Sequence, residues 1–245
     1  MERPDPVAIL CGGRGTRLQE KTRSIPKPLV EIGGRPILWH VIRIYAAHGF
    51  RRFLLLTGYK RELIEAFVDA EPWPEGVVVE CLDTGSETPT GGRVALAAER
   101  GRLGEGTVAL TYADGVADID LGAALEFHRD HEGAATVTLV QPHSQWGVAR
   151  LEDGDLVRGF VEKPRMEQWI NGGFFFLEPK ALSYLDRDSV LERGPLERLA
   201  GDGELHGYRH GGFWDCMDTY KDSVLLNDLW SEGRAPWRLW GGDGS

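Results

Sequence analysis

Short apolar runs of strand type alternate with longer segments of helical spacing through the first 140 residues of the chain. The strand-type runs cover residues 7–10, 53–57, 77–82, 107–111 and 134–140. The helical segments cover residues 37–48, 60–70, 93–100 and 121–132. Such alternation is typical of a mostly parallel sheet with helices on both faces. We therefore expect an α/β fold with a Rossmann-like sheet flanked by helices.

After Gly147 the spacing changes, and strand-type runs follow one another more closely. Runs at 156–162 and 169–177 precede a helical segment at 180–185, a strand near 205–208 and a final helix near 220–231. No linker separates the two parts. A ten-residue stretch rich in Thr, Gly and Ser, 83–92, has the length of a binding loop. We expect a single domain, residues 1–245, with a C-terminal β-rich elaboration.

The charge and the cysteine content exclude several classes of protein. The chain carries 28 Lys and Arg against 38 Asp and Glu, a formal net charge of −10, which disfavours nucleic acid polymers and anionic membranes as partners. The three cysteines form no CxxC pair, so neither a zinc cluster nor a secreted disulfide framework is predicted. The first apolar run, 7–11, is too short for a signal peptide or a membrane span, and we expect a cytoplasmic protein.

A glycine-rich loop, Leu10-Cys11-Gly12-Gly13-Arg14-Gly15-Thr16-Arg17-Leu18, directly follows the first predicted strand. Glycines at the carboxyl end of a strand let backbone N–H groups approach a phosphate, although the spacing here matches neither GxGxxG nor a P-loop. Six basic and two acidic residues between Arg14 and Arg35 give a local net charge of +4, which indicates a polyanion site. Within this segment, Pro26-Lys27-Pro28 fixes the backbone and favours one aimed ammonium.

Two carboxylates are candidates for a metal site. Asp114 follows a predicted strand, and Asp218 lies far away in the sequence. Mg²⁺ takes one or two protein carboxylates and completes its shell with water and phosphate oxygens, but the residues alone leave a turn or capping role for Asp114 equally open. Asp118 and Asp120 form the Asp-Ile-Asp that a glycosyltransferase would use for a metal. We prefer them as a turn and as the N-cap of the helix that follows.

A series of short motifs along the chain resembles, in the same order, those of the sugar-1-phosphate nucleotidylyltransferases, among them the glucose-1-phosphate cytidylyltransferases. The resemblance covers nearly the whole chain through GGRGTR at 12–17, PKP at 26–28, PILWH at 36–40, LDTG at 82–85, TGGR at 90–93, DGV at 114–116, EKP at 162–164, WINGGFF at 169–175, GFW at 212–214, MDT at 217–219 and APW at 235–237. It implies a fold of the nucleotide-diphospho-sugar transferase type. Residues 1–140 would form the nucleotide-binding half, and residues 141–245 the sugar-phosphate-binding half with the C-terminal helix.

The same resemblance assigns roles around the nucleotide. It implies that Arg17 and Lys27 hold the triphosphate and that Asp114 and Asp218 together coordinate Mg²⁺. Thr88 and Arg93 match a hydroxyl and an arginine that bind cytosine. An arginine can donate to the O2 and N3 acceptors of cytosine, whereas uracil and thymine present a donor at N3. The other nucleotide-binding positions that it implies are Leu10, Cys11, Gly12, Gly13, Arg14, Gly15, Thr16 and Ala113.

On the sugar side, the resemblance implies that Lys163 binds the phosphate of a sugar phosphate and that Glu162 binds sugar hydroxyls. Asn171 and Gly172 offer an amide and free space beside the backbone, which suit a bound sugar. Trp146 and Gly147 match a loop near the sugar. The implied catalytic set is Arg17, Lys27, Asp114, Lys163 and Asp218.

We hypothesise a cytidylyltransferase that converts CTP and a hexose 1-phosphate, first of all α-D-glucose 1-phosphate, to a CDP-sugar and pyrophosphate. The alternatives are dTTP or UTP as the nucleotide, another sugar or cyclitol phosphate, a GT-A glycosyltransferase, or a non-catalytic nucleotide-sugar binder. Cys11 and Ala113 stand where the family usually has Ala and Gly. The segment 67–77 is shorter than in typical cytidylyltransferases, so a homo-oligomer stays an open expectation.

Overall fold

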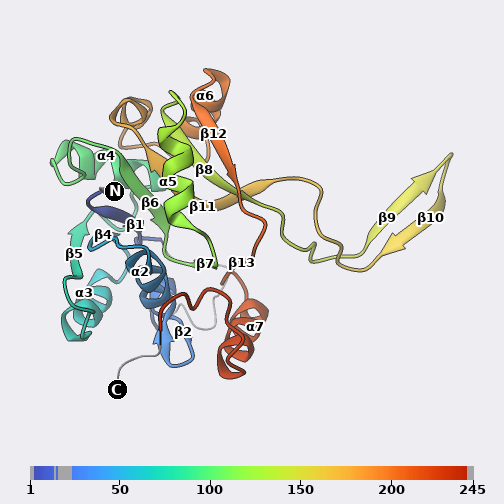
Figure 1. Ribbon diagram of the computed structural model, residues 1–245, viewed down its shortest axis with the longest axis horizontal. Coiled ribbons are helices and arrows are strands. Elements are labelled where there is room, and N and C mark those ends of the chain that lie inside the picture. The colour runs from blue at the N-terminus through green and yellow to red at the C-terminus, as the bar shows by residue number, and fades with distance from the viewer. Residues whose placement is uncertain (1–2, 14, 16–23, 242–245) are drawn as a thin grey trace.

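The computed structural model describes residues 3–13, 15 and 24–241, and at its centre is a seven-stranded sheet (Figure 1). The strands lie in the order β12-β8-β11-β6-β1-β4-β5. Their bounds are β1 Val7–Leu10, β4 Arg52–Thr57, β5 Val78–Asp83, β6 Val108–Tyr112, β8 Ala135–Val140, β11 Ile170–Leu177 and β12 Leu205–Arg209. The five strands predicted in the first half are confirmed, each within one residue at either end.

Most of the sheet is parallel, as predicted. β1 pairs in parallel with β4 and β6, and β5 runs parallel to β4. β11 differs because it runs antiparallel to both of its neighbours, β6 and β8. Phe174, Phe175 and Phe176 of this strand are all buried, so both of its faces are apolar enough for the centre of the sheet. The second half of the chain therefore contributes β11 and β12 to the same sheet as the first half.

Helices cover both faces of the sheet. Their bounds are α2 Ile37–Ala47, α3 Arg61–Ala70, α4 Thr90–Glu99, α5 Leu121–Arg129, α6 Pro195–Gly201 and α7 Tyr220–Ser231, with 3-10 helices at Lys27–Leu29 and Pro179–Tyr184. Successive side chains of a strand point to opposite faces, so Val7 and Ile9 of β1 enter one core cluster while Ala8 and Leu10 enter the other. The first cluster includes residues of α2, α3, α5 and α7, and the second includes residues of α4 and α6.

One helix boundary differs from the prediction in a way that affects the site. α4 begins at Thr90, after Pro89 as its N-cap, rather than at Arg93. The irregular segment after β5 is therefore shorter than expected. Arg93 lies in the first turn of α4, where its side chain is buried.

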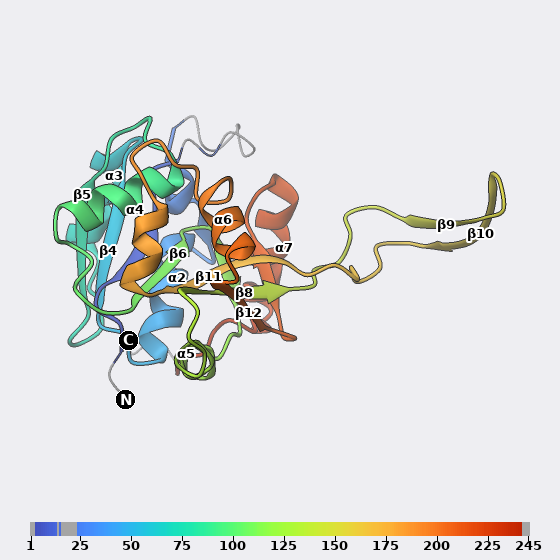
Figure 2. The ribbon, with the colours of Figure 1, turned by 90° about the horizontal axis from the view of Figure 1, so that it is seen from above.

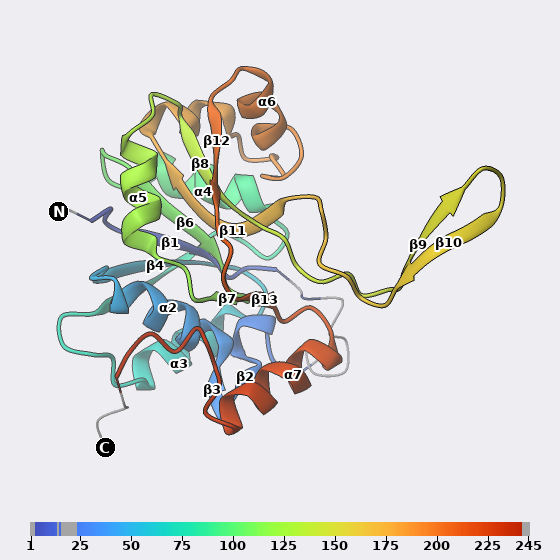
Figure 3. The same ribbon diagram turned by 45° about the vertical axis from the view of Figure 1, so that its right-hand side comes forward.

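Among the described residues, three short ladders lie outside the main sheet. β7 (Gly115–Ala117) pairs with β13 (Trp214–Cys216), and β2 (Glu31–Ile32) pairs with β3 (Arg35–Pro36). β9 (Val148–Glu152) and β10 (Leu156–Val161) form an antiparallel hairpin that projects from the body (Figures 1, 2 and 3). We call residues 148–161 the arm. In the described part of the chain, none of the helices is both long enough and apolar enough to cross a membrane.

Candidate active site

A cavity of about 340 Å³ opens at the carboxyl ends of β1 and β6. These strands are parallel neighbours, and open α/β sheets bind their ligands at this edge. The cavity is lined by Leu10, Cys11, Gly12, Gly13, Gly15, Lys27, Pro28, Thr88, Pro89, Thr90, Arg93, Tyr112, Ala113 and Asp114. Most of the predicted nucleotide-binding residues thus surround one space. Arg14, Thr16 and Arg17, which were also predicted, lie outside the described residues.

Two prolines hold Lys27 at the start of a 3-10 turn. Pro26 has the extended conformation, and the N–H of Val30 donates to the carbonyl oxygen of Lys27 at 3.0 Å, which closes the turn. Because each proline fixes φ and lacks an N–H, the backbone beside Lys27 has little freedom. The motion left to this residue is that of its side chain.

Asp114 and Asp218 are brought together by the ladder between β7 and β13. β7 begins directly after Asp114, and β13 ends two residues before Asp218. The register pairs Gly115 with Cys216, and the N–H of Met217 donates to the carbonyl oxygen of Asp114 at 2.9 Å. Figure 3 shows β7 and β13 side by side. The ladder thus explains how two acids from opposite halves of the chain meet.

The N-terminus of α7 then fixes Asp218. The N–H groups of Asp218 and Thr219 donate to Oδ2 of Asp222 at 3.1 and 2.7 Å. In return, the Thr219 hydroxyl accepts from the N–H of Asp222, which completes a capping box. The carboxylate of Asp218 is therefore presented from a rigid helix start.

The ammonium of Lys27 contacts both carboxylates. Its Nζ lies 2.7 Å from Oδ2 of Asp114 and also donates to Oδ1 of Asp218. The Lys27 side chain is only 13% exposed, against 31% for Asp114 and 28% for Asp218. Burial by itself lowers the pKa of Lys27, but contact with the two carboxylates raises this pKa above its ordinary value. Lys27 therefore stays protonated at neutral pH.

The donor set at this point fits the expected Mg²⁺. Two carboxylates, Asp114 and Asp218, approach one cationic group from different elements. Mg²⁺ is bound in proteins by one or two carboxylates, with water and substrate phosphates completing its shell. The cavity beside the glycine loop provides the space for those phosphates. The assignment of these two acids to Mg²⁺ stays a prediction that their arrangement supports.

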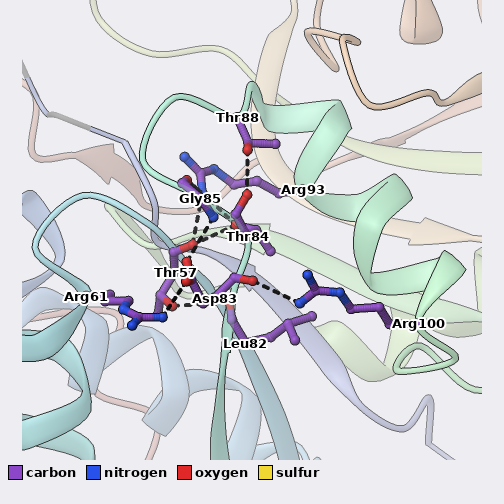
Figure 4. A network of polar contacts seen from close by, with 9 residues as sticks. All are labelled: Thr57, Arg61, Leu82, Asp83, Thr84, Gly85, Thr88, Arg93 and Arg100. Atoms are coloured by element: carbon purple, nitrogen blue, oxygen red, sulfur yellow. Dashed lines mark hydrogen bonds and ion pairs between the residues drawn. The ribbon is translucent and has the colours of Figure 1, made fainter.

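Arg93, predicted to bind cytosine, is buried and links the glycine loop, the end of β4 and the loop after β5, and Figure 4 shows its contacts with the last two of these. Its Nη1 donates to the carbonyl oxygens of Thr57 and Gly85 at 2.9 and 2.8 Å and to Oγ1 of Thr84 at 2.6 Å. Its Nη2 donates to the carbonyl oxygen of Gly12 at 3.0 Å. The guanidinium thus ties the glycine loop to the end of β4 and to the loop after β5. Its contact with cytosine stays a prediction beside this observed role.

Two glycines leave room for this guanidinium. A Cβ on Gly12 would lie 2.0 Å from Cζ of Arg93, and a Cβ on Gly58 would lie 2.5 Å from its Nη1. Both distances are far below van der Waals contact. The close packing of the backbone around Arg93 therefore requires glycine at these two positions.

Thr88 lines the cavity and lies in the loop that Arg93 holds. Its hydroxyl donates to the carbonyl oxygen of Thr84, which leaves the lone pairs of Oγ1 to accept a hydrogen bond. Gly85 in the same loop has a φ of +92°, a conformation that glycine adopts without strain. A hydroxyl that can only accept suits the amino group of cytosine and not the carbonyl at the same position of uracil.

Four of the predicted sugar-binding residues flank the arm. Trp146 and Gly147 directly precede β9, and Glu162 and Lys163 directly follow β10. They do not line the cavity that the described residues form. Lys163 has a φ of +48° before a proline, and such strained backbone persists mainly at functional sites. These four residues therefore lie at the base of the arm and outside the lining of the nucleotide pocket of their own chain.

Asn171 and Gly172 in β11 lie closer to the pocket. Nδ2 of Asn171 donates to the hydroxyl of Tyr112 at 3.4 Å, and Tyr112 lines the cavity. The carbonyl oxygen of Gly172 accepts from Nε1 of Trp214 at 2.7 Å, which links β11 to β13. These two predicted residues thus adjoin the site that holds Asp114.

Comparison with known proteins places the chain in a family. Residues 7–200 match the nucleotidyl transferase family. The chain belongs to this family. This nucleotidyl transferase is 40% identical to a glucose-1-phosphate cytidylyltransferase of Salmonella typhi over 260 residues, covering 96% of this chain and 99% of the relative. It is 43% identical over 256 residues to a Bacillus subtilis protein named probable glucose-1-phosphate cytidylyltransferase, covering 96% and 99%.

Solved structures share the fold of this nucleotidyl transferase. HddC of Yersinia pseudotuberculosis superimposes with a TM-score of 0.71 at 21% identity, covering 91% of this chain and 98% of that chain. UDP-glucose pyrophosphorylase of Acinetobacter baumanii gives a TM-score of 0.68 at 18% identity, covering 90% and 91%. The predicted fold of the nucleotide-diphospho-sugar transferase type is therefore confirmed.

Tyr112 is a pocket residue of this nucleotidyl transferase that no motif indicated. Its hydroxyl donates to Glu192 and accepts from Asn171. Burial raises the pKa of Tyr112, so its hydroxyl stays a donor at physiological pH. The available signal was its position, because it ends β6 directly before Ala113 and Asp114.

The acids of the Asp-Ile-Asp motif have other partners in this nucleotidyl transferase. The Asp120 side chain accepts from the N–H of Ala123 at 2.9 Å and caps α5, which confirms the predicted N-cap. Oδ1 of Asp118 lies 3.0 Å from Nε2 of His210. The arrangement gives the glycosyltransferase alternative no support.

Proposed function

We propose that this chain is a glucose-1-phosphate cytidylyltransferase, which converts CTP and α-D-glucose 1-phosphate to CDP-glucose and pyrophosphate. The observation that carries the proposal is the meeting of Asp114 and Asp218 at Lys27, beside a cavity lined by the glycine loop. Identity of 40% over nearly the full length to a relative of that name supports the choice of base and sugar.

The reaction needs little covalent work from the protein. An oxygen of the sugar phosphate attacks the α-phosphorus of CTP, the bond from that phosphorus to the bridging oxygen breaks, and pyrophosphate leaves. The attacking phosphate is already ionised at neutral pH, so a general base is not required. The residues of the chain act instead by positioning the reactants and by neutralising charge.

The predicted catalytic residues and Thr88 have distinct tasks in this scheme. Lys27, Arg17 and the N–H groups of the glycine loop hold the triphosphate. Lys163 holds the phosphate of the nucleophile. When bound to Asp114 and Asp218, Mg²⁺ supplies positive charge that offsets the negative charge of the phosphates. Thr88 accepts a hydrogen bond from the amino group of cytosine.

A pyrophosphate-release assay tests the choice of substrates. We expect release when CTP is combined with glucose 1-phosphate, and little release when UTP, dTTP, ATP or GTP replaces CTP. Release with UTP or dTTP and not with CTP would contradict the proposed base. The absence of release with any nucleotide and any hexose 1-phosphate would favour a non-catalytic binder.

Arg93→Ala is expected to relax the choice of base. The variant loses the donors that favour cytosine and frees the loop that carries Thr88, so the ratio of kcat/KM for CTP over UTP should fall about tenfold or more. Arg93→Lys is the control because it keeps the charge but cannot reach four acceptors at once. An unchanged ratio in Arg93→Ala would contradict a contact with cytosine and leave Arg93 only its role in holding the loops.

We also infer that the arm packs against a second copy of the chain. Leu151, Val157 and Phe160 share one face of the arm and are 61, 50 and 65% exposed. An isolated two-stranded hairpin is only marginally stable in water, and clustered exposed apolar side chains mark interaction surfaces. A second copy is the favoured occupant because Glu162 and Lys163 flank the arm and do not line the pocket of their own chain.

Sedimentation velocity tests this assembly. We expect an oligomer for the wild-type chain at micromolar concentration and a monomer for Val157→Ser with Phe160→Ser, which share one face of the arm. Val224→Ser with Leu225→Ser removes two apolar side chains of α7 that are 40 and 47% exposed, and it should leave the oligomer intact. A monomeric wild-type chain, or equal behaviour of the two double variants, would contradict the assignment of the arm.

A further inference from the structure

The ammonium of Lys27 lies between Asp114 and Asp218, the two carboxylates assigned to the divalent cation. It contacts one oxygen of each carboxylate, at 2.7 Å in the case of Asp114. The Lys27 side chain is 13% exposed, and both carboxylates are about 70% covered, at 31% and 28% exposure. A divalent cation that binds the same two carboxylates would meet this ammonium at close range. Like charges repel strongly at such distances in a partly buried site.

The surroundings of Lys27 offer its ammonium a second partner. Lys27 lines the cavity together with Gly12, Gly13 and Gly15, where the phosphates of a nucleotide are proposed to bind. Pro26 and Pro28 fix the backbone, so a change of partner needs rotation of the side chain only. Lysine is suited to this exchange because its ammonium is a compact charge on a flexible stem.

We propose that Lys27 blocks the metal site against divalent cations until a nucleotide binds. Without nucleotide, its ammonium occupies the place of the divalent cation between Asp114 and Asp218. It leaves these carboxylates when a triphosphate in the cavity offers it anionic oxygens. The metal therefore enters with the nucleotide and not before it. The inference rests on the proposed function for the role of the two acids as metal ligands.

This block by Lys27 sets the order in which nucleotide and metal bind. In the free enzyme, the ammonium of Lys27 offsets part of the charge of the two carboxylates and occupies their shared contact position, so their affinity for a divalent cation is low. The triphosphate draws the ammonium away and brings its own negative charge, so the affinity for the cation rises at that moment. Occupancy of the metal site thus reports that a nucleotide is bound.

Binding of Mn²⁺ alone, followed by electron paramagnetic resonance, tests the proposal without any substrate or turnover. Lys27→Met should bind Mn²⁺ at least tenfold more tightly than the wild-type chain, because the two carboxylates lose their internal cation. Lys27→Gln keeps a polar side chain in contact with the acids and should show the same direction of change. Lys27→Gln also replaces Lys27→Met in the measurement if Lys27→Met folds poorly.

Lys180→Met is the matched control. It removes the same charge from a surface lysine that pairs with Glu204 at 2.9 Å, so its Mn²⁺ affinity should equal that of the wild-type chain. Adding Asp218→Asn to Lys27→Met should abolish the gain. Mn²⁺ should also raise the unfolding temperature of Lys27→Met more than that of the wild-type chain.

Equal Mn²⁺ affinity in the wild-type chain and in both Lys27 variants would overturn the proposal that Lys27 blocks the metal site. So would an equal gain in Lys180→Met, or a gain that persists in the double variant with Asp218→Asn. These outcomes are distinct from failure of the proposed function. If the variants bind Mn²⁺ with the expected affinities but no CDP-glucose forms, the block of the metal site by Lys27 is supported and the cytidylyltransferase assignment is contradicted.

Discussion

Asp218→Asn should lower kcat for CTP and glucose 1-phosphate by about 10²–10³-fold, the size of effect found when one group that stabilises transition-state charge is removed. The amide keeps the shape of the side chain but loses the negative charge that faces Asp114 and Lys27. The capping box of Thr219 and Asp222 uses backbone N–H groups of this segment and does not need the Asp218 carboxylate. The fold should therefore be retained.

Steady-state rates of pyrophosphate release measure this effect, and circular dichroism checks the fold. Asp228→Asn is the control, since it makes the same chemical change at an exposed position of α7. Turnover within a few fold of wild type in Asp218→Asn would remove Asp218 from the machinery of the reaction. A loss of the same size in Asp228→Asn would assign the effect to α7 as a whole.

Trp237→Ala is expected to lower the free energy of unfolding by about 3–5 kcal/mol, the usual cost of removing a buried aromatic side chain. Trp237 is fully buried, and its Nε1 donates to Nδ1 of His40 at 3.3 Å. Its ring stacks on Phe213 with centroids 5.4 Å apart and lies beside Trp230. The residue thus anchors the C-terminal segment on α2 and on the residue before β13.

Urea unfolding followed by circular dichroism measures the change in stability. Trp146→Ala is the matched control, because Trp146 is 73% exposed and its removal should change the free energy of unfolding by less than about 0.5 kcal/mol. Equal stability of Trp237→Ala and wild type would show that the C-terminal segment contributes nothing to the core. Equal losses in both tryptophan variants would contradict the assignment of buried and exposed roles.

The strands of the first half could be predicted because each is a short apolar run between turn residues. β1, with Val7 and Ile9 facing one cluster and Ala8 and Leu10 facing the other, is apolar on both faces. The same property made β11 recognisable as a strand but not as a central one. An apolar run indicates that a strand is buried, but it does not indicate which strands pair with that strand.

The site could be predicted in its residue types but not in its assembly. Asp114 and Asp218 meet through the ladder of β7 and β13, two strands of three residues each, too short for a hydrophobic pattern to reveal. The resemblance to the nucleotidylyltransferases implied the meeting, and the register of Gly115 with Cys216 explains it.

Arg93 shows a second limit of prediction from sequence. Its position in TGGR agreed with a role at the base, but its four hydrogen bonds to Gly12, Thr57, Thr84 and Gly85 depend on where three loops end in space. No local pattern contains that information. The positions of Lys163 and Glu162 beside the arm depend likewise on how β9 and β10 project from the body.

The formation of CDP-glucose tests the central claim most directly. Phosphorus NMR of the wild-type chain with CTP, glucose 1-phosphate and Mg²⁺ should show CTP and glucose 1-phosphate consumed in equal amounts. The two coupled phosphorus signals of CDP-glucose and the signal of pyrophosphate should replace the signals of the substrates. Persistence of both substrates, or breakdown of CTP to CDP and phosphate without a sugar nucleotide, would contradict the account.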